Sequence, residues 1–347
     1  MNKKLKTILI TGGAGFIGSA IVRKLIKKNY FIVNIDKLTY ASNLNNLLSI
    51  KKYKNYKFIK SDIAKIEKLK KIIKKYTPQY IVNCAAETHV DRSINSSKPF
   101  IRSNIIGTYN LLECIREIFF EKSNFNKGKF KLFHQVSTDE VFGDSIKAIK
   151  PPNENSSYNP SSPYSSSKAS SDHLVMAWGR TFDIPYSISI CTNNYGPYQF
   201  PEKLIPKTIL NALNGKKIPI YGNGKQIRDW LFVDDHASAI EKIMFNSKSK
   251  NNKFNISGNN QINNLDLVKM ICRKLDAKVK IKPKNIKSFE NLIHFVEDRP
   301  GHDRRYFLNS NKIYKLLRWT PQKDIRHGLN ITLNWYLKNI KWWRKKY

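Results

Sequence analysis

The chain has 347 residues, of which 41% are hydrophobic, so it can bury a core in one large or two modest domains. Its formal net charge at pH 7 is +36, but lysine and arginine are spread along the whole chain without a nucleic-acid-binding motif, which argues against nucleic acid as a partner. The four cysteines form no CxxC pair, and no apolar run approaches the roughly 18 residues of a membrane helix, so we expect a cytoplasmic protein with no metal site and no membrane span.

A strand, a glycine-rich turn and a helix are predicted at the start of the chain. Residues 6–10 are β-prone, residues 11–18 read Thr-Gly-Gly-Ala-Gly-Phe-Ile-Gly, and the apolar residues that follow have helical spacing. This order is the context that a dinucleotide-binding turn requires. Gly12, Gly15 and Gly18 let the backbone approach a pyrophosphate, whose charge then lies at the helix N-terminus.

Asp36 follows the next predicted strand, residues 30–35. A carboxylate there accepts hydrogen bonds from the adenosine ribose and repels a 2′-phosphate, which favours NAD over NADP. Lys37 beside it leaves NADP open. Further strands are predicted at residues 56–60 and 80–84, with a helix between them, so the start of the chain has the strand–helix alternation of a parallel sheet.

Small and then polar residues follow the strand at 80–84. Ala85 and Ala86 would allow a cofactor to approach closely, and the polar residues after them would face the same crevice. His89 is among them, and its position favours a role on the substrate side over a purely structural one.

The acid pair Asp139-Glu140 follows a predicted buried strand at residues 130–136 and the hydroxyl residues Ser137 and Thr138. Neighbouring carboxyl groups push their pKa values apart, so that one can stay protonated as an acid while the other serves as a base. Such a pair suits a reaction that removes a proton from one atom and delivers one to the next. The alternative is an ordinary polar turn.

Tyr164 and Lys168 are four residues apart in a predicted helix that follows a segment rich in proline and serine. They therefore share one helical face. An ammonium near a phenol lowers the tyrosine pKa, so this pair predicts a tyrosine that accepts a proton.

The strand–helix alternation fades after a predicted strand at residues 186–191. We therefore predict an NAD-binding domain over residues 1–190 and a domain over residues 191–347 that mainly binds the substrate. The fold class is α/β, a Rossmann-type doubly wound parallel sheet with a smaller C-terminal substrate-binding domain. Arginines with aromatic neighbours in the second part suit recognition of a diphosphate and a base.

Taken together, these motifs resemble the extended short-chain dehydrogenase/reductase superfamily, and within it the nucleoside-diphosphate-glucose 4,6-dehydratases. The resemblance spans about residues 8–336 and is most specific in Ser-Thr-Asp-Glu-Val-Phe-Gly, Ile-Arg-Asp-Trp and Asp-Arg-Pro-Gly-His-Asp. It departs from the family pattern at Ser42 and Ser257, where the family usually has glycine, and at Phe142, where tyrosine is common. Ser42 puts local packing around the cofactor in doubt.

The resemblance implies a role for each matching position. Thr138 would bind the sugar O4, Asp139 would be the acid, Glu140 the base, and Tyr164, beside Lys168, the base for oxidation. NAD would contact a further set that includes part of the glycine-rich turn: Phe16, Ile17, Asp36, Lys37, Leu38, Thr39, Asp62, Ile63, Ala85, Ala86, Tyr164, Lys168 and Asn194. The nucleotide sugar would be held by Thr88, Asn193, Lys203, Leu204, Pro219, Tyr221, Arg228, Asn264, Arg299 and His302.

The implied activity is that of an NAD-dependent lyase that converts dTDP-glucose or UDP-glucose to the 4-keto-6-deoxyglucose nucleotide and water, for deoxysugar biosynthesis of the rhamnose type. The sequence leaves the base open between dTDP and UDP. A nucleotide-sugar 4-epimerase is the main alternative, although epimerisation needs no elimination and therefore no acid pair. The resemblance also implies a homodimer packed through the helices around Leu111 and Leu174.

Overall fold

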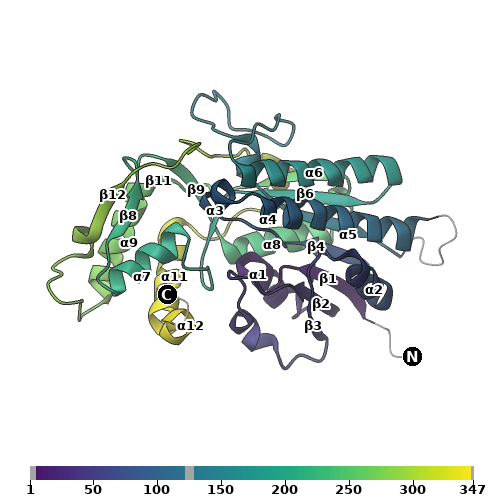
Figure 1. Ribbon diagram of the computed structural model, residues 1–347, viewed down its shortest axis with the longest axis horizontal. Coiled ribbons are helices and arrows are strands. Elements are labelled where there is room, and N and C mark those ends of the chain that lie inside the picture. Colours follow the sequence, from purple (N-terminus) through teal and green to yellow (C-terminus); the bar gives the residue numbers. More distant parts are fainter. Residues whose placement is uncertain (1–4, 122–128, 345–347) are drawn as a thin grey trace.

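A seven-stranded sheet forms the centre of the larger of two lobes in the computed structural model, which describes residues 5–121 and 129–344 (Figure 1). The strand order is β10-β6-β5-β4-β1-β2-β3, and each neighbouring pair is parallel. The bounds are β1 (Lys6–Thr11), β2 (Tyr30–Asp36), β3 (Tyr56–Lys60), β4 (Tyr80–Asn83), β5 (Leu132–Thr138), β6 (Tyr186–Cys191) and β10 (Asn252–Ile256). The predicted Rossmann-type fold is therefore confirmed, with its change of winding direction between β1 and β4.

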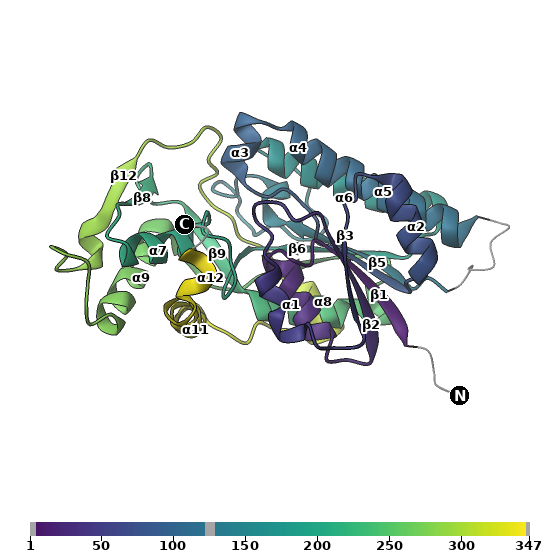
Figure 2. The same ribbon diagram turned by 60° about the horizontal axis from the view of Figure 1, so that its bottom comes forward.

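Helices cover both faces of this sheet (Figures 1 and 2). Leu9 and Val33 point into the apolar cluster beneath α2, α5 and α6, whereas Ile8, Ile10 and Ile32 point into the cluster beneath α1 and α8. Because both faces are buried, the strands are nearly continuous apolar runs. The bounds are α1 (Phe16–Leu25), α2 (Ile66–Tyr76), α3 (Val90–Asn95), α4 (Lys98–Phe100), α5 (Gly107–Ile115), α6 (Pro163–Phe182) and α8 (Val233–Met244), with π-helical segments η2 (Ile101–Ile106) and η3 (Arg116–Phe120) on either side of α5.

The smaller lobe has two short sheets, β11-β9-β7 and β12-β8, packed against helices. Its core contains Tyr195, Trp230, Leu267 and Leu333, all buried. The strands are β7 (Asn193–Tyr195), β8 (Ile218–Tyr221), β9 (Ile227–Phe232), β11 (Gln261–Asn263) and β12 (Ile293–Val296). The helices are α7 (Leu204–Leu213), α9 (Asn264–Lys278), α11 (Ile325–Lys338) and α12 (Ile340–Arg344).

Short 3-10 helices complete the chain: η1 (Leu44–Ile50), η4 (Asp139–Phe142), η5 (Ser247–Ser249) and η6 (Phe289–Leu292).

Three elements that follow residue 190 belong to the larger lobe. Strand β10 extends its sheet beside β6, α8 packs against α1, and α10 (Asn311–Leu317) packs on β10. The chain therefore passes between the lobes more than once after residue 190, and the division at that residue stays a prediction. Strand β5 also differs in its bounds from the strand predicted at residues 130–136. It ends at Thr138 instead of the predicted residue 136, because Val136, Ser137 and Thr138 continue the pairing with β6.

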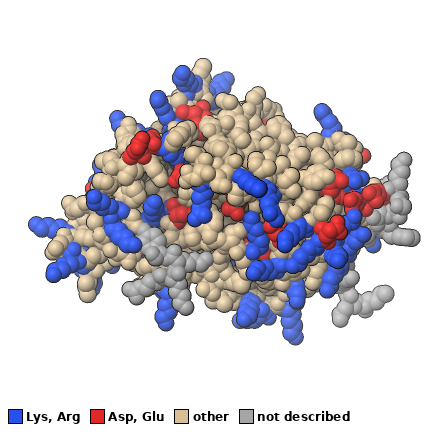
Figure 3. Space-filling view, viewed as in Figure 1, with Lys and Arg blue, Asp and Glu red and all other residues tan. Residues whose placement is uncertain are grey.

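Basic side chains lie over both lobes on the face shown in Figure 3, with acidic side chains between them. All four cysteines are free thiols. Among the described helices, none is long and apolar enough to cross a membrane. The described ranges also contain no group of three or more histidine, cysteine, aspartate or glutamate side chains arranged to hold a metal ion.

Candidate active site

A cavity of about 510 Å³ lies at the C-terminal ends of the sheet strands and is lined by both lobes. This is the position at which doubly wound sheets bind their ligands. With the exception of Leu38, every residue predicted for cofactor, substrate or chemistry lines the cavity. Leu38 packs its side chain on the apolar cluster beneath α1, and its backbone N–H donates to Asp36 Oδ1 over 2.8 Å. Its contribution to the site is therefore through the backbone.

The glycine-rich turn forms the floor of the cavity below α1. Gly12 has a φ of +68°, and a Cβ on it would lie 2.7 Å from the backbone nitrogen of Ala85, so another residue would not fit. Gly15 is the N-cap of α1 and has no side-chain capping bond. A Cβ on Gly15 would meet only the carbonyl oxygen of Gly12 within 4 Å, at 3.2 Å, so this side of the turn is open. The first N–H groups of α1 are therefore available to an anion.

The Asp36 carboxylate is held in place at the end of β2 by three donors. Its Oδ2 accepts from the N–H of Ala14, at 3.0 Å, and its Oδ1 accepts from the N–H of Leu38 and the hydroxyl of Ser42, both at 2.8 Å. Ser42, the departure that put packing here in doubt, thus adds a hydrogen bond to the residue predicted to select the cofactor.

The Lys37 ammonium contacts two groups that lie outside β2. It forms an ion pair with Glu87 at 3.2 Å and donates to the hydroxyl of Ser103 at 2.7 Å. These partners neutralise and orient the amine, so it is poorly placed to neutralise a 2′-phosphate. The position of the Lys37 ammonium therefore favours NAD over NADP.

The acid pair follows the C-terminal end of β5, at the start of η4. Thr138 is the N-cap of η4, and its hydroxyl accepts from the N–H of Glu140 at 3.4 Å. Asp139 is buried, and burial together with the neighbouring Glu140 carboxylate raises its pKa well above the usual range. Burial also raises the pKa of Glu140, but the nearby cations Arg299, Lys203 and Arg228 oppose this rise. The two carboxyls therefore differ, with Asp139 the one that more readily stays protonated.

Tyr164 and Lys168 share one face of α6, but their electrostatics differ from the prediction. Burial, followed by the Glu140 carboxylate, raises the pKa of Tyr164 well above its usual value, whereas a lowered pKa was expected. The Lys168 ammonium donates to the backbone carbonyl of Val136 at 2.8 Å, and its own pKa is lowered by burial. The expected lowering was wrong for the protein alone, because desolvation outweighs the effect of one ammonium that is already hydrogen-bonded.

Asp172 extends this face by one more turn, and the sequence reasoning missed it. Its Oδ2 accepts from the hydroxyl of Ser137 at 2.5 Å and from the hydroxyl of Tyr158 at 3.3 Å. Lys168 and Asp172 thus hold two successive residues at the end of β5, Val136 and Ser137. The repeat of four residues from position 164 to 168 to 172 is the signal that could have revealed it.

Polar contacts join the two lobes across the cavity mouth. The Lys203 ammonium donates to the backbone carbonyl of Thr88 at 2.8 Å. Asp91 of α3 pairs with Arg299 at 3.3 Å and accepts from the hydroxyl of Tyr221 at 3.1 Å. Asp91 was not predicted as a site residue, because its partners lie more than a hundred residues away in the sequence.

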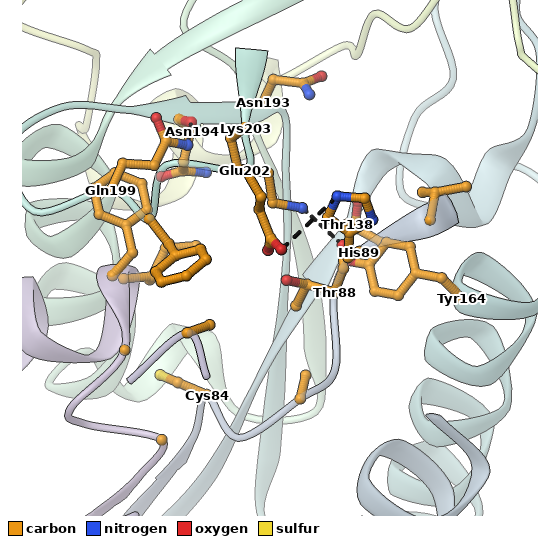
Figure 4. Close-up of a pocket in the computed structure, with 18 of the residues that line it drawn as sticks. Cys84, Thr88, His89, Thr138, Tyr164, Asn193, Asn194, Gln199, Glu202 and Lys203 are labelled. Atoms are coloured by element: carbon orange, nitrogen blue, oxygen red, sulfur yellow. Dashed lines mark hydrogen bonds and ion pairs between the residues drawn. The ribbon is translucent and has the colours of Figure 1, made fainter. Parts of the chain in front are cut away.

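Two histidines line the same region. His89 caps α3 through Nδ1, and its Nε2 lies 3.8 Å from the Glu202 carboxylate, in the middle of the view in Figure 4. Burial lowers the pKa of His89 to about 4, so its ring is neutral near pH 7. His302 Nδ1 lies 2.5 Å from Asp298 Oδ1, which fixes the orientation of its ring. His89 therefore has both the structural role and the position in the cavity that the sequence left as alternatives.

Several buried polar atoms of the lining have no hydrogen-bond partner within the described protein. Groups of this kind are costly unless a ligand or water binds them. They come from both lobes and include donors and acceptors: Asp139 Oδ2, Asn193 Oδ1, Gln199 Oε1, Glu202 Oε2, Trp230 Nε1, Asn264 Oδ1 and Arg299 Nε. A large polar ligand with many hydrogen-bonding groups fits this lining.

Known proteins resemble the chain over nearly its whole length. A sequence model of the family described as GDP-mannose 4,6 dehydratase matches residues 9–332. dTDP-glucose 4,6-dehydratase of Escherichia coli is 50% identical over 97% of this chain and 95% of its own. The structure of dTDP-glucose 4,6-dehydratase from Bacillus anthracis str. Ames in complex with NAD has a TM-score of 0.85 and 41% identity, over 99% of this chain and 100% of that one. The Streptomyces venezuelae enzyme with NAD and dTDP bound has a TM-score of 0.87 and 35% identity, over 98% and 100%.

Epimerases share the fold at lower identity. UDP-glucose 4-epimerase of Thermotoga maritima, solved with UDP-glucose, has a TM-score of 0.82 but 27% identity, over 96% of this chain and 99% of that one. The fold alone therefore does not separate the two activities, whereas sequence identity over the full length does. The family match and the 50% identity to the Escherichia coli enzyme show that the chain belongs to this family of nucleotide-sugar 4,6-dehydratases, together with the dTDP-glucose 4,6-dehydratases.

Proposed function

We propose that this protein is a dTDP-glucose 4,6-dehydratase, which uses NAD to convert dTDP-glucose to its 4-keto-6-deoxy derivative and water. The observation that carries the proposal is the Asp139-Glu140 pair, of which Asp139 is buried and Glu140 is partly buried, in the same cavity as Thr138 and Tyr164. A 4-epimerase needs one base at the sugar hydroxyl, whereas elimination of water from C5 and C6 needs a second base and an acid on adjacent atoms. The relatives named above support dTDP as the nucleotide, with UDP as the alternative.

The acid pair would carry out the elimination. Glu140, whose negative charge is favoured by Lys203, Arg228 and Arg299, would remove the proton from C5. Asp139, kept protonated by burial, would donate its proton to the hydroxyl that leaves C6. The hydroxyl would then leave as water, and the two carboxyls would have exchanged protonation states.

Tyr164 and Thr138 would act at the sugar O4. Thr138 would hold O4 by a hydrogen bond from the end of β5, and Tyr164 on α6 would accept its proton. Because burial raises the pKa of Tyr164, deprotonation needs positive charge in the cavity. Lys168 supplies one ammonium, which donates to the Val136 carbonyl and whose charge the nearby Asp172 favours.

The glycine-rich turn and Asp36 fit NAD. The turn leaves the uncapped N-terminus of α1 open to a pyrophosphate, and Asp36 presents a fixed carboxylate to a ribose. Bound NAD would supply the hydride chemistry between C4 and C6 and a positive nicotinamide ring in the cavity. Since each cycle restores the oxidised form, we expect purified protein to release NAD when it is denatured.

The smaller lobe would hold the nucleotide diphosphate. Helix α7 begins at the cavity with Lys203 as its N-cap and no side-chain capping bond, so its first N–H groups can bind a phosphate. Arg228 and Arg299 would add cationic donors. Three of the other predicted contacts would hold the base and sugars from β8 and α9: Pro219, Tyr221 and Asn264.

Turnover of dTDP-glucose and UDP-glucose by the purified protein tests the proposal. The product should have lost one water by mass spectrometry, and dTDP-glucose should turn over faster. A product of unchanged mass with an inverted C4 centre would identify an epimerase. Loss of water from UDP-glucose alone would keep the dehydratase and correct the nucleotide.

We also propose a homodimer that packs through α5 and α6. Tyr109 of α5 is 39% accessible, and apolar side chains on the neighbouring α3 and η2 are also exposed, with Ile94 39%, Ile101 43% and Ile106 43% accessible. Leu111 itself is buried within the protomer, so the contact would involve its exposed neighbours. Light scattering of the purified protein and of Ile106→Asp would test this, since the charge should shift the protein toward monomer.

Four free thiols suit a reducing compartment, which supports the cytoplasm.

A further inference from the structure

The C-terminal helix α12 contacts the cofactor-binding end of the larger lobe. In both ribbon views α12 lies between α7 of the smaller lobe and α1 of the larger one (Figures 1 and 2). Trp342 is 9% exposed, and its ring packs in an aromatic cluster with Trp335 at 4.9 Å and Tyr198 at 6.1 Å between ring centres. Its indole Nε1 donates to Asn46 Oδ1 at 3.0 Å. This buried bond joins residues almost three hundred positions apart.

Asn46 connects that bond to the glycine-rich turn. Asn46 is 1% exposed, and its Nδ2 donates to the carbonyl oxygen of Ala14 at 3.1 Å. The same carbonyl accepts from the N–H of Asn43 at 3.0 Å, while the N–H of Ala14 donates to Asp36. Both the N–H and the carbonyl of Ala14, between Gly13 and Gly15, are therefore hydrogen-bonded.

A second contact strengthens the same joint. The Arg23 guanidinium of α1 donates to the backbone carbonyl of Asn46 at 3.0 Å and lies 4.4 Å above the ring of Tyr198. Tyr198 belongs to the aromatic cluster that contains Trp342. The turn, α1 and η1 thus meet the C-terminal helix in one network of buried and partly buried side chains.

We infer that Trp342 is a positioning residue for NAD: through Asn46 it holds the Ala14 carbonyl and so keeps the glycine-rich turn in the conformation that binds the pyrophosphate. This inference rests on the NAD binding proposed above. A turn that is free to change its backbone conformation would pay an ordering cost on each binding event, and the network removes that freedom beforehand. Weakening the network should therefore speed NAD release and leave the nucleotide-sugar contacts unchanged.

Trp343 provides a matched control. It lies on the same helix, is 4% exposed, and its Nε1 donates to the carbonyl oxygen of Tyr336 at 3.0 Å. Trp342→Phe and Trp343→Phe therefore each remove one buried indole donor from α12. They differ in where the donor points, toward the glycine-rich turn or within the smaller lobe.

The test measures NAD dissociation from the purified full-length protein and hydrogen exchange of the amides in residues 12–18. Trp342→Phe should speed dissociation by about 3- to 10-fold, as expected for one buried hydrogen bond that is lost beside an acceptor left unpaired. It should also speed amide exchange in the turn, whereas Trp343→Phe should leave both rates within about 2-fold of the wild type. The KM for dTDP-glucose, measured with saturating NAD, should not change in either variant.

Asn46→Ala keeps the aromatic cluster but removes the two side-chain hydrogen bonds of Asn46, to the Trp342 indole and to the Ala14 carbonyl. It therefore provides the test if Trp342→Phe does not fold. Alone it should speed NAD release as Trp342→Phe does, and the double variant should be no faster than Asn46→Ala. The inference would be overturned if Trp342→Phe and Trp343→Phe changed the NAD dissociation rate equally. It would also be overturned if neither Trp342→Phe nor Asn46→Ala changed that rate. If the wild type binds no NAD, the proposed function fails, and the exchange rates alone decide whether Trp342 holds the turn.

Discussion

Replacing Glu140 by glutamine should separate the two halves of the proposed reaction. Glutamine keeps the size and hydrogen bonding of the side chain but cannot accept a proton. The Glu140 charge is the second cause, after burial, that raises the pKa of both Asp139 and Tyr164. Without it Asp139 should stay protonated, because burial remains, while deprotonation of Tyr164 becomes easier. Oxidation at C4 should therefore persist, and removal of the C5 proton should not.

The expected loss follows from the role of a positioned base. General-base catalysis contributes roughly 10²- to 10⁴-fold, which is about 3–5 kcal/mol of activation free energy. Burial raises the pKa of Glu140, and the nearby cations Arg299, Lys203 and Arg228 oppose this rise, which helps Glu140 to act as a base. Asp139→Asn should slow product formation by a similar factor, since an amide is a poor proton donor. The two losses should not add fully, because both residues act in one step.

Solvent exchange at C5 distinguishes the two variants. In D₂O, Asp139→Asn should still let Glu140 remove and return the C5 proton, so recovered dTDP-glucose should gain deuterium at C5. Glu140→Gln should leave recovered substrate unlabelled, although nicotinamide absorbance on mixing should still report the first oxidation. Wild-type deuterium exchange in Glu140→Gln would refute its assignment as the base, and loss of exchange in Asp139→Asn would refute the separation of roles.

Three further variants test the surroundings of this pair. Tyr164→Phe should lower turnover by about 10²- to 10⁴-fold, with dTDP affinity by calorimetry unchanged; near-normal turnover would contradict its assignment. Asp91→Asn should raise the KM for dTDP-glucose several-fold with little change in kcat, because Arg299 and Tyr221 lose the carboxylate that orients them; an unchanged KM would remove that role. Burial raises the pKa of Asp172 to about 6, so its proton stabilises the folded state below about pH 4, and this stability is lost as the pH rises through 6. Asp172→Asn should flatten that part of the pH dependence in denaturant titrations, and an unchanged profile would exclude Asp172 as its source.

Local sequence signals were sufficient for the parts of the site that lie within single motifs. Gly12 and Gly18 specify a turn that larger residues cannot form, and Asp139 with Glu140 and Tyr164 with Lys168 are close in sequence as well as in space. Such groups are visible because the backbone of one strand or one helix brings them together.

Contacts between distant segments left no comparable signal. The tail with Trp342 and Trp343 has no periodicity that points to α1, and Asp91 meets its partners only when α3 faces the smaller lobe. The pKa of Tyr164 was also beyond reach, because it depends on how far folding removes water and on which acceptor Lys168 finds. Burial and hydrogen-bond partners are properties of the folded chain, so spacing alone gave the wrong direction.

Two sets of contacts between the lobes differ in their chemistry. Near α12 they are buried and aromatic, with the Trp342 indole committed to one acceptor. Across the cavity mouth they are polar, Lys203 with Thr88 and Arg299 with Asp91, and they use side chains proposed to hold the nucleotide sugar. Replacing partly exposed polar contacts by ligand contacts costs little free energy. Separating a buried indole from its partners costs more, because its packing and its hydrogen bond are lost together. We therefore expect substrate to enter by exchanging the second set while the first keeps the glycine-rich turn in place, so that one NAD molecule serves many turnovers.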